Sequence, residues 1–284
     1  PTSVHHNWGS EDEGVGRCAD LCSYSPFTNR MYFRYKVTAS TWEKRTVSKV
    51  VFRAYETWSY SCTASGVKIS LVAASKVNDA TNWNNKPDLV DKLGDRNVAY
   101  GRGSKCSPSS PASWVEFKDN PDETDENLTK AVRTKLADGD PIGIALSASD
   151  ESSSNSWKRF QANNAELSVT YNTKPDTPTA LGTADPTTKC VTGDLRPIIR
   201  DSAPILRASG DDDDNQNLTA TFELTDKTSG AVKTYKDGPR SDTAVFTYQL
   251  PALTHGHRYS WRVKMNDGIN DSVGWSGSCA KFRR

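Results

Sequence analysis

Val67-Lys-Ile-Ser-Leu-Val72 alternates apolar and polar side chains with a period of two residues. Successive side chains of a β-strand point to opposite faces, so this alternation predicts a strand with one face in a core and the other in water. Other runs on both sides of it mix aromatic and β-branched residues with charges, which also favours strands. We expect these further strands at residues 31–37, 49–55, 113–117, 142–146, 157–160 and 166–171.

One segment has a helical period instead. Leu128, Val132 and Leu136 recur every four residues, and Gly139 follows where a helix would end. Asp125 is the expected N-cap residue. A single short helix among many strands predicts an all-β sandwich in which the helix covers one edge or open end.

The last part of the chain has its own set of shorter predicted strands. They lie at residues 205–208, 218–224, 231–235, 244–250, 258–265 and 280–282. Roughly seven short strands separated by regular turns suit an immunoglobulin-like sandwich. The stretch before them is rich in Pro and Thr and lacks an apolar period, so we interpret residues 173–188 as a linker. It would join a first domain, residues 1–172, to a second, residues 189–284.

The composition excludes several classes of protein. The 284 residues are 35% hydrophobic, and no apolar run approaches the roughly 18 residues that a membrane-spanning helix needs. Basic and acidic residues balance, with 22 against 21 in residues 1–174 and 14 against 14 in residues 175–284, which argues against a nucleic-acid partner. The 8 Trp, 10 Tyr and 8 Phe can anchor a core, so the low mean hydropathy of -0.69 does not indicate disorder.

The even number of cysteines indicates disulfides, and therefore a secreted protein from an oxidising compartment. Six cysteines allow about 15 connectivities. Consecutive pairing, with the last two cysteines beyond the linker, favours Cys18–Cys22, Cys62–Cys106 and Cys190–Cys279. A zinc site at the first pair is the alternative, but its only nearby partners are two histidines, His5 and His6, at the N-terminus.

The two ends of the sequence predict a segment of a longer protein. The chain begins at Pro1 without a basic and apolar leader, so a removed signal peptide is the alternative. Its end on Lys281-Phe-Arg-Arg284, directly after a predicted strand, favours a segment.

Four motifs in the first domain give it a family likeness. They are Thr28-Asn-Arg-Met-Tyr-Phe-Arg-Tyr35, Ala54-Tyr-Glu-Thr-Trp-Ser-Tyr-Ser-Cys62, Ala80-Thr-Asn-Trp-Asn-Asn-Lys-Pro87 and Trp157-Lys-Arg-Phe160. Together they resemble a DNRLRE-type domain of secreted actinobacterial proteins, over roughly residues 8–172. The resemblance implies a jelly-roll sandwich related to carbohydrate-binding modules. The sequence before Met31 is short for the first strands of such a fold.

The second domain resembles a fibronectin type III-like module. The likeness rests on Ala220-Thr-Phe-Glu-Leu224, on Tyr259-Ser-Trp-Arg-Val263 and on Trp275. It implies a spacer sandwich, and such pairs of domains resemble accessory parts of large secreted or cell-surface proteins. Neither resemblance implies a catalytic centre.

Sugar binding requires exposed aromatic faces beside polar groups that bond to hydroxyls. Three motifs of the first domain supply this chemistry, and each tryptophan also has a structural interpretation as a core residue or turn anchor. Both interpretations stay open at this point. The candidate ligand-binding residues are Trp58, Tyr60, Trp83, Asn84, Asn85, Trp157 and Arg159.

An acidic tract in the second domain is a candidate calcium site. It presents oxygen donors at alternate positions, Asp211, Asp213, Asn215 and Asn217. Ca²⁺ takes six to eight oxygens, which an alternating turn can supply in part. Gln216 stands where an EF-hand requires Gly, so the tract is not an EF-hand. A solvated turn between strands is the alternative. No cofactor is required, and a structural Ca²⁺ is the metal that we consider.

No sequence motif assigns a catalytic residue. The sequence lacks a Gly-x-Ser-x-Gly nucleophile motif and a phosphate-binding loop. We therefore expect a non-catalytic, extracellular segment that binds a polysaccharide or cell-surface glycan, without nucleic acid and without membrane insertion. One alternative is a structural segment of a secreted toxin or adhesin complex that binds another protein chain. Another is a glycoside hydrolase whose carboxylates converge only on folding.

Overall fold

The computed structural model describes residues 9–283 in two units. Residues 20–21, 23–25, 124–125, 186, 192–197 and 278 lie outside this description, and only the backbone of 279–283 is within it. The first unit comprises Pro1–Glu43 and Val47–Tyr171, and the second comprises Lys44–Thr46 and Asn172–Arg284. Each unit pairs two sheets around its own core, so the all-β prediction is confirmed.

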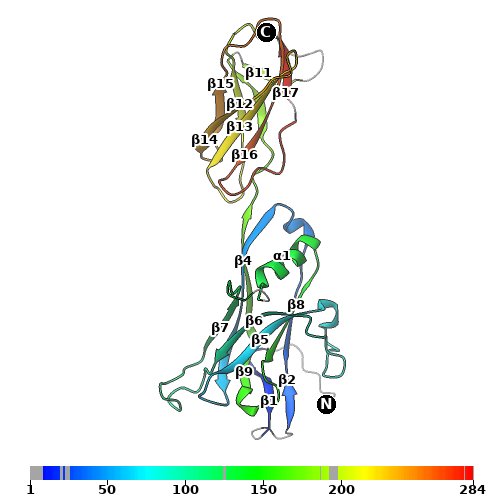
Figure 1. Ribbon diagram of the computed structural model, residues 1–284, viewed down its shortest axis with the longest axis vertical. Coiled ribbons are helices and arrows are strands. Elements are labelled where there is room, and N and C mark those ends of the chain that lie inside the picture. Colours follow the sequence, from blue (N-terminus) through cyan, green and yellow to red (C-terminus); the bar gives the residue numbers. More distant parts are fainter. Residues whose placement is uncertain are drawn as a thin grey trace. The chain divides into compact units, whose positions relative to one another are not determined.

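The first unit is a jelly roll. One of its sheets has the order β2 (Phe27–Asn29), β1 (Asp12–Cys18), β9 (Lys158–Thr173), β4 (Arg45–Ser59) and β7 (Ser113–Lys118). The other has the order β3 (Met31–Tyr35), β8 (Ile142–Ala148), β5 (Ser65–Val72) and β6 (Asp91–Val98). The strands β1 and β2 precede Met31, so the short N-terminal sequence suffices to begin the fold (Figure 1).

The core of the first unit lies between these sheets. Phe52, Phe117 and Phe160 come from three strands of the larger sheet and are fully buried. In β5, Val67 and Ile69 point into the core as their alternation predicts. Leu71 continues the same face and packs against the core, and Ser70 and Val72 on the opposite face are buried as well. The register shift with β6 leaves the extra residue on β6, so β5 keeps its alternation and its unbroken pairing with β8. The two strands expected at 157–160 and 166–171 are one continuous strand, β9.

The helix α1 (Leu128–Asp138) packs Leu128, Val132 and Leu136 against this core. Gly139 ends it with a positive φ of 71°, a conformation that glycine adopts without steric cost. The expected N-cap, Asp125, lies outside the described residues, and the N-cap is Asn127. In Figure 1 the helix lies beside β4, where the backbone nitrogen of Val50 donates a hydrogen bond to the hydroxyl of Thr129. Short 3-10 turns occur at Ala39–Thr41, Ala74–Lys76 and Ser154–Ser156.

The second unit has the strand arrangement of a fibronectin type III-like sandwich. One sheet has the order β11 (Thr187–Lys189), β10 (Thr179–Ala184), β12 (Ile205–Ser209) and β15 (Val245–Gln249). The other has the order β14 (Val232–Arg240), β13 (Leu218–Asp226), β16 (Arg258–Asn266) and β17 (Cys279–Arg283). Leu206, Phe222 and Trp261 are buried in the core between them.

The segment 173–188 is not a structureless linker. It contains β10, which pairs with β12, and the start of β11. Within β10 only Gly182 and Thr183 are buried, so the strand lacks the apolar period that identifies a strand in the sequence. Its place in the sheet comes from backbone pairing with a partner that follows it by more than 20 residues.

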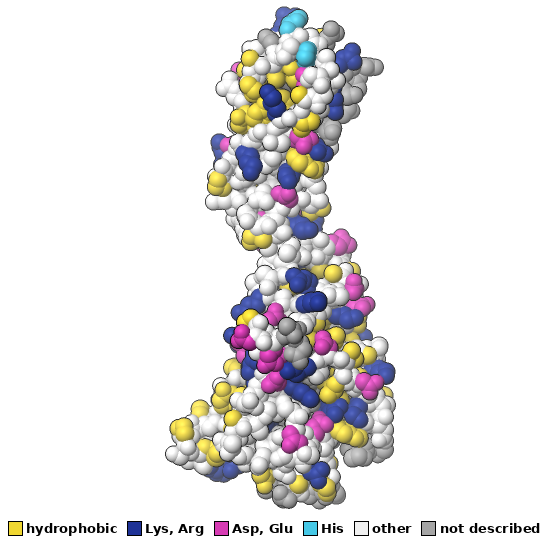
Figure 2. Space-filling model, in the orientation of Figure 1, with side chains coloured by type: hydrophobic (Ala, Val, Ile, Leu, Met, Phe, Trp, Pro, Cys, Tyr) yellow, Lys and Arg dark blue, Asp and Glu magenta, His cyan; other side chains and the backbone are white. Residues whose placement is uncertain are grey.

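Two of the three expected disulfides are described, Cys18–Cys22 and Cys62–Cys106. Cys190 is also disulfide-bonded, and the side chain of its expected partner Cys279 lies outside the described ones. Such bonds indicate an oxidising environment. No helix in the described part of the chain is long and apolar enough to cross a membrane. On the face that Figure 2 shows, basic and acidic side chains are interspersed.

Candidate functional site

The structure brings three of the predicted ligand-binding residues together. Trp58 lies at the end of β4, and the ring of Tyr60 meets it edge-on at a centroid distance of 6.4 Å. Arg159 of β9 and Arg102 of the loop before β7 each place their guanidinium carbon 5.4 Å from the centre of the Trp58 ring. We call Trp58, Tyr60, Arg102 and Arg159 the Trp58 cluster. Arg102 is the member that the sequence did not suggest.

Neighbouring strands fix two sides of the Trp58 cluster. The hydroxyl of Thr57 donates a hydrogen bond of 3.2 Å to the backbone oxygen of Arg159. The backbone nitrogen of Tyr60 donates one of 2.9 Å to the backbone oxygen of Trp157. These bonds hold the end of β4 against the start of β9, so the side chains of Trp58 and Arg159 are close without a long connecting loop.

A tight loop brings Arg102 to the same place. Gly101 has a φ of 82°, and a Cβ atom on it would lie 2.0 Å from the backbone oxygen of Thr57, so only glycine allows this approach. The loop is closed by hydrogen bonds between Gly103 and Ser110 in both directions. The Cys62–Cys106 disulfide ties it to the chain that follows β4.

A buried ion pair lies directly beneath these strand ends. The side chains of Glu56 and Lys158 are fully buried, with Nζ of Lys158 3.6 Å from Oε1 of Glu56. That oxygen also accepts a hydrogen bond from the backbone nitrogen of Tyr100, and Lys158 donates to Ser59 and to the backbone oxygen of Val98. Burial raises the pKa of Glu56 to about 7 and lowers the pKa of Lys158. The pair links β4, β9 and the chain entering the loop of Arg102.

Trp83 belongs to a separate loop, apart from the Trp58 cluster. The ammonium of Lys86 lies 4.1 Å from the centre of the Trp83 ring and donates to the backbone oxygen of Trp83. The side-chain amide of Asn85 is used within the same loop, since it accepts from the backbone nitrogen of Asn82 and donates to the backbone oxygen of Ala80. Asn84 is exposed on the rim of a polar hollow beside this loop. These contacts within the loop favour a role of Trp83 as a turn anchor over a role as a ligand contact.

Trp157 is a core residue. Only 4% of it is exposed, and its ring meets that of Phe27 edge-on at 5.7 Å. A Cβ atom on Gly14 would lie 1.9 Å from this ring, so β1 approaches the indole closely. This burial favours the core interpretation of Trp157 over a ligand contact.

The acidic tract of the second unit forms an exposed turn. Asp211, Asp213, Asn215 and Asn217 all point to solvent, whereas Asp212 between them is buried. The Asp212 carboxylate accepts a hydrogen bond of 2.8 Å from the backbone nitrogen of Asp214, which holds the turn. Calcium binding by the four alternate residues stays a prediction.

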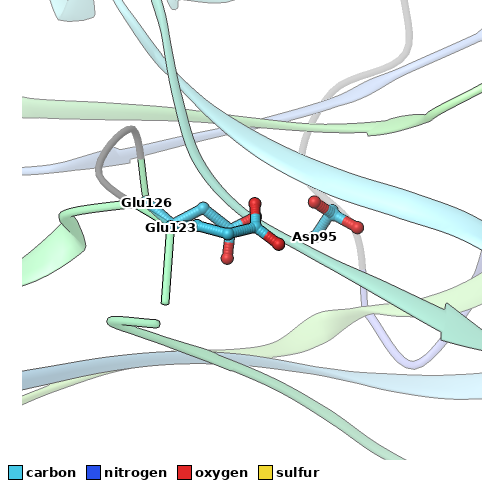
Figure 3. A group of neighbouring side chains, drawn as sticks. All are labelled: Asp95, Glu123 and Glu126. Atoms are coloured by element: carbon cyan, nitrogen blue, oxygen red, sulfur yellow. The ribbon is translucent and has the colours of Figure 1, made fainter. Parts of the chain in front are cut away.

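Within the described part of the chain, three carboxylates do converge elsewhere. Asp95, Glu123 and Glu126 place one oxygen each within 4.8 Å of the others, and Figure 3 shows Glu123 and Glu126 side by side and facing Asp95. A hydrogen bond with Glu126 lowers the pKa of Asp95, and burial raises the pKa of Glu126. Three such groups could ligate a divalent cation. The ammonium of Lys92 already lies 3.2 Å from an oxygen of each, so the cluster has a cation of its own at the place where a metal ion would bind.

Comparison with known proteins adds little to this site. No protein-family model matches the sequence, and no curated protein matches it. A β-glucuronidase from Parabacteroides merdae has a TM-score of 0.25 at 9% identity, covering 92% of this chain and 29% of that one. A putative β-galactosidase from Bacteroides fragilis has a TM-score of 0.24 at 12% identity, and the match covers 96% of this chain and 35% of that one. The twitchin kinase region of C. elegans has a TM-score of 0.25 at 16% identity, and the match covers 39% of this chain and 17% of that one. The chain spans 35% or less of each of these proteins, and the TM-scores are too low to assign it a family or a function.

Proposed function

We propose that this chain is a non-catalytic, extracellular segment whose first unit binds a glycan at the Trp58 cluster, with the second unit as a spacer. The supporting observation is that Trp58, Tyr60 and Arg159 converge at one end of the sandwich. An indole and a phenol at an angle of 83° offer an apolar wall with polar edges, which suits a sugar ring and its hydroxyls. The disulfides support an extracellular location.

A glycoside hydrolase is less favoured by the arrangement of the described carboxylates. Glycosidases need two carboxyl groups on opposite sides of the scissile bond, roughly 5–9.5 Å apart. Asp95 and Glu126 have pKa values shifted in opposite directions, as such a pair needs. However, Glu126 is 2% exposed and is hydrogen-bonded to Asp95 itself, so a sugar could not enter between the two groups.

A protein-assembly segment is also less favoured. Its surface would carry a contiguous apolar patch. The large apolar side chains that are most exposed in the described part, Val90, Ile198 and Ile269, come from three separate loops. Single exposed side chains of this kind are ordinary on soluble proteins and indicate no interface.

The test is glycan binding by the whole chain and three tryptophan variants. We expect binding on a glycan array, confirmed by calorimetry, that Trp58→Ala weakens at least about tenfold, the effect of losing roughly 1.4 kcal/mol. Trp83→Ala tests the loop of Trp83, and Trp275→Ala in the second unit is the matched control for loss of a half-buried indole under an arginine. Both should bind within about twofold of the parent chain. Binding to no polysaccharide at all, or loss with Trp83→Ala alone, would contradict the proposal.

A further inference from the structure

Arginines lie over tryptophan rings at several places, and the Trp58 cluster differs from the rest in its charge. At three other sites in the described residues the arginine over the ring is also held by a glutamate, whose oxygens lie within 2.6–3.2 Å of its nitrogens. These sites are Arg30 on Trp83 with Glu151, Arg53 on Trp114 with Glu166, and Arg262 on Trp275 with Glu223.

The two arginines of the Trp58 cluster have no such partner. Among the described residues, no carboxylate forms an ion pair with Arg102 or Arg159. Nε of Arg102 is buried and makes no hydrogen bond, although burying a charged donor without a partner is costly. Both guanidinium carbons lie 5.4 Å from the same ring centre, so they are at most 10.8 Å apart, close enough to repel at low ionic strength. A bound anion would offset the positive charge of both guanidinium groups.

We infer that the ligand of the Trp58 cluster is an acidic glycan, whose carboxylate or sulfate pairs with Arg102 and Arg159 while its sugar ring packs against Trp58 and Tyr60. This inference rests on the proposed glycan-binding function and adds the class of sugar. Guanidinium groups bind planar or tetrahedral oxyanions through parallel N–H donors, so both anions are compatible with the pair. A neutral sugar would leave the two positive charges uncompensated.

The cluster is already assembled before a ligand binds. Gly101, the Cys62–Cys106 disulfide and the buried pair of Glu56 and Lys158 fix the backbone that carries its side chains. Binding therefore loses little free energy to the ordering of loops, which favours a higher affinity. The charge gives the interaction a salt dependence that stacking alone would not have.

The experiment compares three soluble polymers by calorimetry with the whole chain. Polygalacturonate carries carboxylates, dextran sulfate carries sulfates, and dextran is neutral. We expect at least one acidic polymer to bind and dextran not to bind, with an affinity that falls at least fivefold between low and physiological salt. Arg159→Gln and Arg102→Gln should each weaken binding about tenfold or more. Arg53→Gln, which removes a neutralised arginine from Trp114, should leave it within twofold.

The outcomes separate this inference from the proposed function. Dextran or another neutral glycan bound as tightly as the acidic polymers, with loss in Trp58→Ala, would overturn the acidic-glycan inference and keep the glycan-binding function. Acidic polymers that bind equally to Arg159→Gln would overturn it as well. If the chain binds no glycan at all, both the acidic-glycan inference and the proposed glycan-binding function are wrong. Arg159 is exposed, so its variant should fold even if Arg102→Gln does not, and a thermal melt of each variant checks this.

Discussion

Nζ of Lys158 lies 3.6 Å from Oε1 of Glu56, and both side chains are fully buried between the sheets of the first unit. The two residues are 102 positions apart in the sequence, on β9 and β4. Removing water from both charges costs free energy, and the attraction between the charges and their hydrogen bonds offset only part of that cost. The pair therefore has consequences for stability that an exposed ion pair would not have.

Replacing the cation should destabilise the first unit. Lys158→Met leaves the Glu56 carboxylate buried without its counter-ion, so at pH 8 we expect the free energy of unfolding to fall by about 3 kcal/mol or more. At pH 5 the loss should be smaller, because Glu56 can then hold a proton. Urea unfolding measures both values. Lys135→Met, which breaks the half-exposed pair with Asp140, is the control and should change stability by less than about 1 kcal/mol.

Glu56 should make stability depend on pH near neutrality. Burial raises its pKa from the ordinary 4.5 to about 7, so the folded state binds its proton more tightly than the unfolded state. Its contribution to the free energy of unfolding is therefore full below about pH 4.5 and is lost as the pH rises through 7. At roughly 1.36 kcal/mol per pH unit, the loss is of the order of 3 kcal/mol. The difference between the parent chain and Glu56→Gln, measured from pH 4.5 to 8, isolates it. A constant difference would mean that Glu56 does not titrate there.

The local patterns of the sequence predict the strands well because burial on one face imposes a period of two. They do not predict β10, since only two adjacent residues of that strand, Gly182 and Thr183, are buried. Its strand character comes from pairing with β12. The start of α1 differs from prediction by a few residues for a similar reason. The backbone nitrogen of Thr129 donates to Asp119, a residue outside the helix, and this contact is invisible in the helical period.

The candidate site could be predicted only in part. Trp58, Tyr60 and Arg159 could be singled out because aromatic and polar side chains alternate in their own segments. Arg102 could not, because its place beside Trp58 depends on Gly101 and on a disulfide that joins residues 44 positions apart. For Trp157 the sequence left a core role and a ligand contact open, because the indole is covered by Gly14 and Phe27, which lie more than 100 positions away in the chain.

The loop of Arg102 should depend on its first glycine. Gly101→Ala introduces both a positive φ and a Cβ atom 2.0 Å from the backbone oxygen of Thr57. Gly103→Ala introduces a positive φ alone, since no atom lies within 4 Å of its Cβ position. We expect about 1 kcal/mol of destabilisation for Gly103→Ala and at least twice that for Gly101→Ala. Only Gly101→Ala should also weaken glycan binding. Equal effects of the two variants would argue against close packing of this loop.

The two described disulfides should differ in their contribution to stability. Cys62 and Cys106 are separated by 44 positions, and Cys18 and Cys22 by 4. In the chain-entropy model the long loop contributes about 4 kcal/mol and the short one about 2 kcal/mol. Replacing each pair by serines and measuring urea unfolding under oxidising conditions tests the order. The Cys62/Cys106 variant should in addition bind acidic glycan more weakly, whereas the Cys18/Cys22 variant should not.

Trp157 and Trp58 should respond to truncation in opposite ways. Trp157→Ala removes a buried indole that packs on Phe27, so we expect a loss of about 3–5 kcal/mol in the free energy of unfolding. Trp58 is only half-buried, and Trp58→Ala should cost far less stability while it weakens glycan binding at least about tenfold. Binding by Trp157→Ala is measured at a temperature where its melt shows it folded, and it should match the parent chain. A folded Trp157→Ala that no longer binds would place Trp157 in the site and remove the distinction between core and ligand contact on which the proposal depends.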